Sequence, residues 1–110
     1  MDSPGNDPFS VTGEIGGGCN LVLFSTGRGS LFGSPLAPTI KLASNSTLFN
    51  RMPDDMDFNA GRVLEGESWQ ALTAELLQQV IAVASGQRTW SESHGPIETE
   101  FVPWQPDAVL

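Results

Sequence analysis

Four consecutive apolar residues, Leu21 to Phe24, lead into a loop rich in glycine. An apolar run without polar alternation is typical of a strand that is covered on both faces, as in a parallel sheet packed between helices. A second strand pattern follows at residues 39–43. In open α/β sheets, ligands bind in the crevice at the carboxyl ends of the strands. The sequence therefore predicts a ligand site in the loop that follows the first strand.

The residues of this loop have the chemistry of an anion site. Glycines can bend the backbone and expose its amides, hydroxyls can donate hydrogen bonds, and an arginine can hold a carboxylate through two parallel hydrogen bonds. The candidate carboxylate-binding residues are Thr26, Gly27, Arg28, Gly29 and Ser30. A plain glycine turn with a solvated arginine accounts for the same residues about equally well, so both interpretations stay open.

Nucleotide-binding motifs do not fit this loop. The dinucleotide fingerprint requires a third glycine three residues after the second, whereas Gly33 comes one residue late and is followed by Pro35 and Pro38 where a helix should begin. The Gly-Lys-Ser/Thr sequence of a phosphate-binding P-loop is absent. We therefore do not expect nucleotide binding.

The net charge of −8 argues against a nucleic-acid partner or an anionic membrane surface. It also makes Arg28 and Lys41 stand out, because they lie in a stretch without acidic residues. No apolar run approaches the ~20 residues that span a bilayer, and the first residues do not resemble a secretory signal. A single cysteine, Cys19, cannot form an internal disulfide and is expected to be a small buried residue. A cytoplasmic location is the resulting expectation.

The strongest helical pattern in the chain begins after Ser68 and ends before Gly86. Its apolar residues recur at spacings of three and four, which is typical of an amphipathic helix. The main stripe and the row beside it comprise Trp69, Leu72, Leu76, Val80, Val83, Leu77, Ile81 and Ala84. A stripe this wide predicts that the helix packs against the sheet.

Weaker patterns complete the predicted architecture. Residues 8–15 and 45–52 fit short helices, and residues 55–59 alternate like a strand with one polar face. We predict an α/β fold: a small three-layer Rossmann-like unit with a short, mostly parallel sheet of about three strands and flanking helices. The whole chain, residues 1–110, is expected to form one domain with a lead-in at 1–19, an α/β core at 20–86 and an extended tail at 87–110.

A metal site is the alternative interpretation of the polar face at residues 55–59. Asp55, Asp57 and Asn59 begin like a calcium-binding loop, but the chain has Ala60 and Gly66 where such a loop needs glycine and glutamate. Acids that cap helices and turns explain these residues better. His94, the only histidine, is expected to be a surface residue, since its spacing supports neither a catalytic triad nor a zinc site.

Several separated motifs occur in order along the chain. They are Pro4-Gly5-x-Asp7-Pro8 with Thr12-Gly13, the run from Asn20 to Gly29, Ala37 to Lys41, Asp55 to Gly61, Ala84 to Thr89, and Glu100-Phe101-Val102-Pro103-Trp104. Together they resemble the carboxyl-terminal part of the altronate dehydratase and galactarate dehydratase family. The resemblance spans nearly the whole chain, and the Phe-Val-Pro-Trp ending favours altronate dehydratase.

The resemblance implies a hydro-lyase that converts altronate to 2-keto-3-deoxygluconate and water, assisted by a divalent metal, iron or manganese. It also implies that this domain is inactive without the remaining domains of a longer enzyme. Galactarate dehydratase, sulfolactate sulfo-lyase and a non-catalytic packing or assembly domain are the alternatives. The implied partners are a sugar-acid substrate and those other domains, with a homo-oligomer as a further option.

Within such an enzyme, the loop at residues 26–30 would hold the substrate carboxylate. Lys41 would be a second carboxylate contact or, with its pKa lowered by desolvation, a catalytic base; a solvated strand end is an equal alternative. Metal ligands are expected mainly on the other domains, with Asp55, Asp57 and Asn59 as minor candidates.

Overall fold

The computed structural model of the protein describes residues 5–95. The described chain folds as α1 (Asp7–Gly16), β1 (Val22–Thr26), β2 (Thr39–Ala43), α2 (Ser46–Arg51), β3 (Phe58–Asn59), the 3-10 helix η1 (Ala60–Glu65), α3 (Trp69–Ala84) and α4 (Trp90–Ser93). The three strands form one parallel sheet in the order β1-β2-β3. This confirms the predicted α/β fold with a short parallel sheet.

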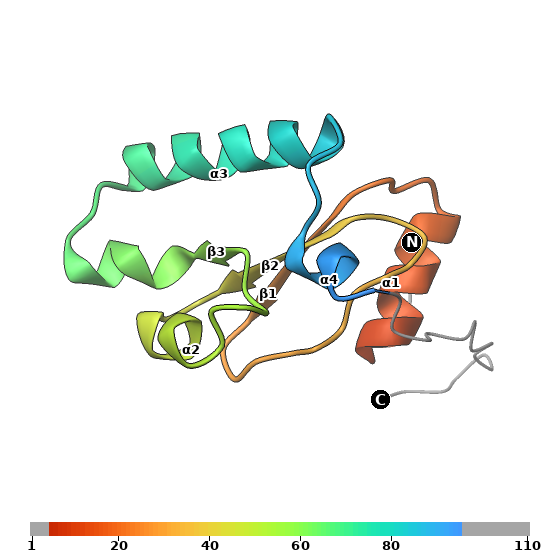
Figure 1. Ribbon diagram of the computed structural model, residues 1–110, viewed down its shortest axis with the longest axis horizontal. Helices are drawn as coiled ribbons and strands as arrows, with labels where there is room; N and C mark the ends of the chain where they lie inside the picture. The colour runs from red at the N-terminus through yellow and green to blue at the C-terminus, as the bar shows by residue number, and fades with distance from the viewer. Residues whose placement is uncertain (1–4, 96–110) are drawn as a thin grey trace.

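Helices α2 and α3 lie on opposite sides of the part of the sheet formed by β2 and β3 (Figure 1). Each helix begins where the sequence offers a side-chain cap: Asn45 accepts a hydrogen bond from the Leu48 amide, and Ser68 accepts one from the Ala71 amide. The core between β2 and α2 contains Ala43, Leu48 and Met56, with Phe49 and Met52 packed against them. This arrangement gives the three layers of the predicted unit.

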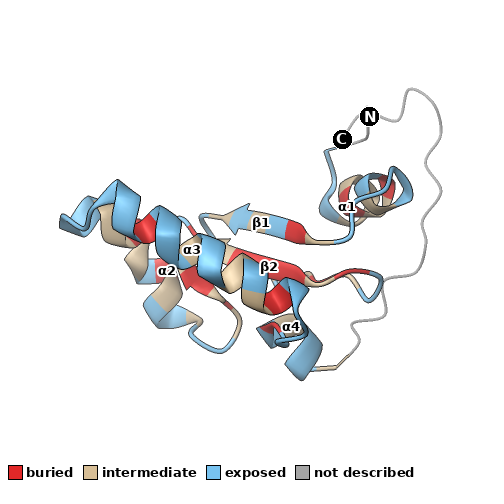
Figure 2. Cartoon of the chain, turned by 90° about the horizontal axis from the view of Figure 1, so that it is seen from above, coloured by how far each residue is buried: buried red, intermediate tan, exposed pale blue. Residues whose placement is uncertain are grey.

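The central strand is β2, whose residues are buried on both faces except for the half-buried Leu42. We predicted this environment for the first strand instead, and that prediction was wrong. β1 pairs with β2 along one edge, from Val22 opposite Thr39 to Thr26 opposite Ala43, and it forms the border of the sheet. Seen from above, α3 passes over β2 and leaves β1 uncovered, so Leu23 is 48% exposed (Figure 2).

The long helix α3 has the predicted bounds but buries only part of its apolar surface. Leu72 and Val83 are buried against the rest of the fold, whereas Trp69, Leu77 and Ile81 are exposed. A sheet of three short strands offers too narrow a surface to cover both rows of the helix. The prediction that the whole stripe packs in the core is therefore corrected: Leu72 and Val83 are buried, and Leu76 and Val80 are partly buried.

Two smaller features also differ from the sequence-based expectations. Cys19, expected to be buried, is exposed, because it lies in the glycine-rich turn between α1 and β1 rather than on the strand. The start of the tail, expected to be extended, forms the one-turn helix α4, which Thr89 caps by accepting a hydrogen bond from the Glu92 amide. The rest of the tail, with its aromatic Phe101 and Trp104, lies outside the described residues. None of the helices within residues 5–95 is long and apolar enough to cross a membrane.

Candidate functional site

The glycine-rich loop leaves the carboxyl end of β1 and is held from several sides. The Ser44 amide donates to the Thr26 carbonyl at 3.0 Å, and the Asn45 side chain donates to the Gly27 carbonyl at 3.0 Å. Within the loop, the Gly29 amide donates to the Thr26 hydroxyl at 3.1 Å. These bonds fix the loop against the start of α2, so its shape is set before any ligand arrives.

The backbone conformation at position 29 and the atoms around it both favour glycine. Its φ of +109° is strained for any residue with a side chain, and a Cβ atom there would lie 2.7 Å from the Met52 sulfur. The backbone at Gly29 therefore packs closely against the side chain of Met52, which follows α2. The amides of Arg28 and Ser30 have no acceptor within residues 5–95 and are available to an anion, whereas the Gly29 amide is already used.

Arg28 is exposed at the tip of this loop and forms no ion pair with any acidic residue of the described chain. The contrast is Arg62, which binds Glu67 at 2.7 Å and Glu75 at 2.8 Å. Those contacts raise the pKa of Arg62 and lower the pKa of Glu67. In a chain with a net charge of −8, a free guanidinium on a fixed loop is chemically available to an oxyanion.

Lys41 lies behind the loop rather than in front of it. Its residue is only 1% exposed, and its ammonium donates to the Ser30 carbonyl at 3.1 Å. Burial lowers the pKa of Lys41 below its ordinary value of 10.5, and the nearby negative charges of Asp55 and Asp57 oppose that shift. The structure thus joins the two parts of the predicted site, with Lys41 supporting the loop that carries Arg28.

Asp57 connects the sheet to α4 through the hydrogen bonds that its carboxylate accepts. One carboxylate oxygen accepts a hydrogen bond from the Lys41 amide at 2.8 Å and the other accepts one from the Trp90 amide at 2.9 Å. The Asp57 carbonyl also accepts a hydrogen bond from the Gln79 side chain at 3.1 Å. These contacts could not be predicted from local sequence patterns, because the residues that they join are up to 33 positions apart.

The minor metal candidates at residues 55–59 make hydrogen bonds within the protein. Asn59 accepts a hydrogen bond from the Gly61 amide and donates one to the Ser46 hydroxyl, and both Asp57 oxygens are occupied as described. Within residues 5–95 no group of three or more His, Cys, Asp or Glu side chains is arranged to hold a metal ion. The described residues therefore do not fit the iron or manganese site that the family resemblance implies.

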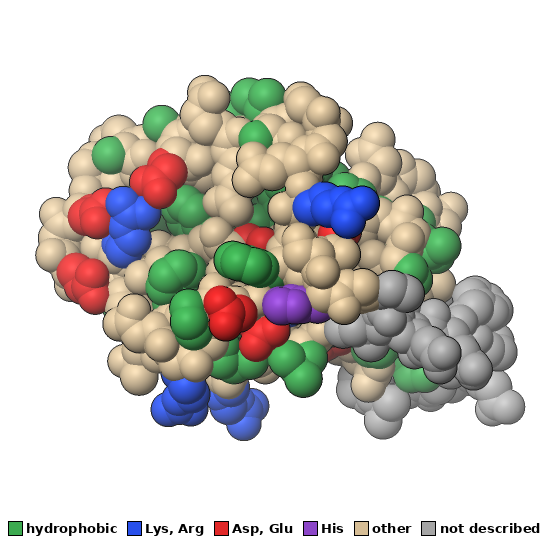
Figure 3. Space-filling view, in the orientation of Figure 1, with side chains coloured by type: hydrophobic (Ala, Val, Ile, Leu, Met, Phe, Trp, Pro, Cys, Tyr) green, Lys and Arg blue, Asp and Glu red, His purple; other side chains and the backbone are tan. Residues whose placement is uncertain are grey.

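His94 is exposed, as the sequence predicts, and it also contacts the turn before β3. Its Nε2 atom lies 2.6 Å from the Asp54 carbonyl, so this nitrogen carries the proton, and 3.9 Å from the Asp55 carboxylate. Its ring stacks on Trp90 with centroids 5.9 Å apart, and the side chain remains half exposed, in purple in Figure 3. These contacts attach the end of α4 to the body of the domain.

Two cavities flank α4, and no residue of the loop at 26–30 lines either of them. One has a volume of about 400 Å³ and lies between α4 and the segment 33–38 that leads into β2. The other, of about 280 Å³, lies between α4 and the second half of α3. Arg88 lines both cavities, although its local sequence does not mark it as a site residue.

Comparison with known proteins shows which family the chain belongs to. The family described as D-galactarate/altronate dehydratase, C-terminal, matches residues 1–109. The chain belongs to this family. Altronate dehydratase of Escherichia coli (strain K12) is 37% identical over 92 residues, which are 84% of this chain and 18% of the relative. Altronate dehydratase of Bacillus subtilis (strain 168) is 40% identical over 88 residues, which are 79% of this chain and 18% of the relative.

A third relative of this chain is named for a different reaction. The (2R)-sulfolactate sulfo-lyase subunit beta of Chromohalobacter salexigens is 32% identical over 103 residues, or 93% of this chain and 26% of that protein. The chain thus spans less than a third of the length of each of these relatives. The full-length relatives named altronate dehydratase are lyases, and this chain is a homologue of one domain of them.

Proposed function

We propose that this domain supplies a carboxylate-binding loop to a sugar-acid dehydratase that acts on altronate. The observation that carries the proposal is the exposed, unpaired guanidinium of Arg28 on a loop that the rest of the fold holds rigid. Membership of the dehydratase family and the two altronate dehydratase relatives support altronate as the substrate. The metal-binding part of such an enzyme would lie outside the described residues.

The chemistry of dehydration explains why a fixed cation beside the carboxylate is useful. The proton next to the carboxylate is removed, the neighbouring hydroxyl leaves as water, and the resulting enol rearranges to a 2-keto acid. Negative charge grows on the carboxylate oxygens as the proton leaves, so donors fixed around these oxygens bind the transition state more tightly than the substrate. The Arg28 guanidinium and the amides of Arg28 and Ser30 are the donors that this domain would supply.

Lys41 has a supporting role in this proposal. Its ammonium fixes the Ser30 carbonyl and brings positive charge beneath the loop, which favours an anion above it. To act as a catalytic base, Lys41 would first have to release the Ser30 carbonyl and become accessible. That assignment stays a prediction.

The substrate class is broader than altronate alone. The family name includes galactarate, and the sulfo-lyase relative is named for a sulfonated substrate. Carboxylates and sulfonates both present several oxygens to a guanidinium, so Arg28 would suit either. Altronate is preferred here because two relatives named for it match this chain with 37% and 40% identity.

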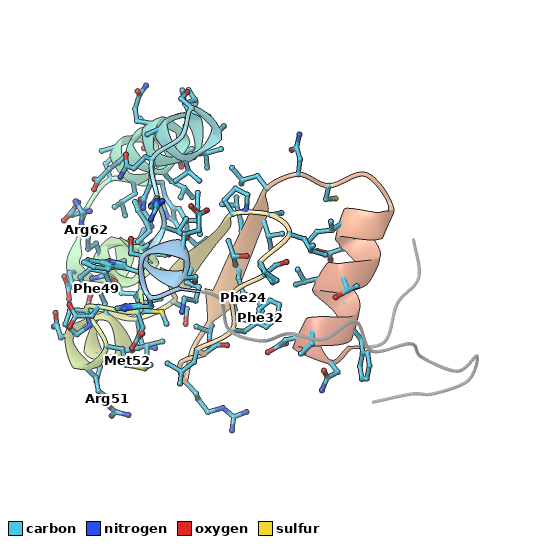
Figure 4. All side chains as sticks on the ribbon, turned by 45° about the vertical axis from the view of Figure 1, so that its right-hand side comes forward. Phe24, Phe32, Phe49, Arg51, Met52 and Arg62 are labelled. Carbon is cyan, nitrogen blue, oxygen red and sulfur yellow. The ribbon has the colours of Figure 1, made fainter. Side chains whose placement is uncertain are left out.

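Replacement of Arg28 in a dehydratase that carries this domain tests the proposal. Arg28→Lys keeps the charge but loses the paired hydrogen bonds, each of which is worth about 1.5–3 kcal/mol to a charged group, so KM for altronate should rise about tenfold or more. Arg51→Lys is the matched control, because Arg51 is also exposed and without an ion pair in the described chain. It points away from the fold in Figure 4. An unchanged KM for Arg28→Lys would remove the loop from the substrate site.

A packing role is the second candidate, and the exposed apolar row on α3 favours it. Leu77 and Ile81 are each about half exposed and lie one helical turn apart, and contiguous exposed apolar side chains are typical of surfaces that contact other protein. If the domain only packs against the rest of the enzyme, Leu77→Gln with Ile81→Gln should weaken assembly while Arg28→Lys leaves KM unchanged. The enzymatic proposal predicts instead that Arg28→Lys raises KM.

A further inference from the structure

A polar cavity of about 280 Å³ lies between α4 and the second half of α3, away from the loop at residues 26–30. Polar side chains make up most of its lining, which includes Asp57, Gln79, Gln87, Arg88, Trp90 and Ser93. The side chains of Gln87, Arg88 and Ser93 make no hydrogen bond within residues 5–95, and Gln79 uses only one donor, toward the Asp57 carbonyl. The cavity therefore presents unused donors and acceptors.

Arg88 supplies the positive charge of this cavity. It is exposed and forms no ion pair in the described part of the chain, although the molecule is strongly acidic. It lies in the short connection between α3 and α4 and also lines the larger cavity on the other side of α4. A guanidinium at this junction has room to bind an anion without displacing a protein partner.

The one acidic side chain in the lining does not oppose an anion strongly. Asp57 already accepts hydrogen bonds from the amides of Lys41 and Trp90, one at each carboxylate oxygen. Its charge also interacts favourably with the ammonium of Lys41. Glu92 lines the larger cavity and not this one, so Arg88 is the charged group left to face a ligand here.

We propose that this cavity is a second sugar-acid subsite, in which Arg88 binds a carboxylate and the side chains of Gln79, Gln87 and Ser93 bind hydroxyl groups. The inference rests on the proposed function for its ligand class but uses residues separate from the loop at residues 26–30. Trp90, which is 42% exposed, offers an aromatic surface to the C–H groups of the sugar chain. Hydrogen-bonding side chains around one cation and one aromatic ring suit a short, polyhydroxylated acid better than an apolar ligand.

Titration of the protein with altronate, followed by NMR, tests the proposal directly. The indole N–H of Trp90 and the side-chain amides of Gln79 and Gln87 should shift in a saturable way. Glucitol, which has comparable hydroxyls but no carboxylate, should cause much smaller shifts, because Arg88 would have no partner. Equal shifts with glucitol and altronate would contradict a subsite built around Arg88.

Variants at two comparable arginines complete the test. Arg88→Met should weaken altronate binding at the Trp90 and Gln87 signals at least about tenfold, since a hydrogen bond to a charged group is lost. Arg51→Met removes the same charge from α2, which lines neither cavity, and should leave these signals unchanged. An equal loss of altronate affinity in both variants would contradict the subsite, because it would mean that binding depends only on the overall charge of the protein.

The outcome also separates this inference from the proposed function. Shifts at Arg28 and Ser30 without shifts at Trp90 and Gln87 would leave the loop as the substrate site and overturn the second subsite. Shifts at Trp90 and Gln87 that survive Arg28→Lys would support the second subsite independently. The cavity is built from this chain alone, so an absence of any response there at tens of millimolar altronate would overturn the inference as well.

Discussion

Lys41 makes the stability of the protein depend on pH in a defined direction. Burial lowers its pKa below 10.5, so the unfolded chain binds more protons at this residue than the folded protein does between the lowered pKa and 10.5. The free energy of unfolding contributed by Lys41 should therefore rise with pH across that window. Below the lowered pKa the lysine is charged in both states, so the free energy of unfolding no longer changes with pH at this residue and the full cost of burying the charge remains.

The contribution of Lys41 to the free energy of unfolding can be measured by chemical denaturation. The natural protein and Lys41→Met are compared at several pH values between 7 and 10.5. Methionine has a similar length and does not titrate. The free energy of unfolding of the natural protein minus that of the variant should increase with pH. A difference that stays constant or falls would contradict the burial of a charged ammonium behind the loop.

Gly61 shows how tightly a single position can be constrained. A Cβ atom there would lie 2.5 Å from the Cα of Asn45, in contact with backbone that cannot move aside cheaply. Gly61→Ala should lower the free energy of unfolding by about 2–3 kcal/mol. Gly16→Ala is the control, because nothing lies within 4 Å of its Cβ position at the end of α1, and thermal unfolding should detect a change of less than about 1 kcal/mol. Similar losses in the two variants would contradict the close approach at Gly61.

At the residue scale, the sequence identified the side chains with available charge but not all of their surroundings. Arg28 was singled out because glycines flank it and acids are absent nearby, and the structure places it exposed on the loop. Arg88 was missed, because its cavity is completed by Asp57 and Gln79 from distant parts of the chain. Local patterns carry no information about such contacts.

At the element scale, local chemistry was sufficient wherever a cap and a periodic pattern coincide. The bounds of β2, α2 and α3 follow from Pro38, Asn45, Pro53 and Ser68, which start or stop regular structure. The exposure of β1 and of one row of α3 was not predictable, because it depends on how much surface the other elements offer. The packing of Phe24 against Phe32, with ring centroids 5.7 Å apart, lies on the side of the sheet nearer α1 (Figure 4).

The Asp57 carboxylate helps to hold the start of α4 against the sheet. Asp57→Ala would remove the acceptor of the Trp90 amide and leave the buried Lys41 amide without a partner, at a cost of about 2–4 kcal/mol. In Asp57→Ala, hydrogen exchange at the Trp90 amide should be faster than in the natural protein. Asp57→Asn, which keeps one oxygen acceptor, should fall between the natural protein and Asp57→Ala; unchanged exchange in both variants would show that α4 is held by other contacts.

The two rows of α3 should respond differently to truncation. Leu72 is 5% exposed and Leu77 is 55% exposed on the same helix. Leu72→Ala should cost about 2–4 kcal/mol in urea denaturation, and Leu77→Ala less than about 1 kcal/mol, because little apolar area is lost from the core. Equal costs would mean that Leu77 is covered in the protein as it exists in solution.

At the scale of the whole molecule, the described domain has more apolar surface than its own core covers. Leu23 on the border strand and Trp69, Leu77 and Ile81 on α3 are all substantially exposed. The relatives named altronate dehydratase are more than five times as long as the segment that this chain matches. The exposed row is where we expect further protein to pack in such an enzyme, while the loop with Arg28 remains open to a small anion.

The most direct test of the central claim is an NMR titration of this protein with altronate, read at the backbone amides of Arg28 and Ser30. The account predicts saturable shifts at these amides that disappear in Arg28→Met and persist in Arg51→Met. Altronate binding that leaves both amides unmoved, or that Arg28→Met does not weaken, would contradict the assignment of the loop as the carboxylate site.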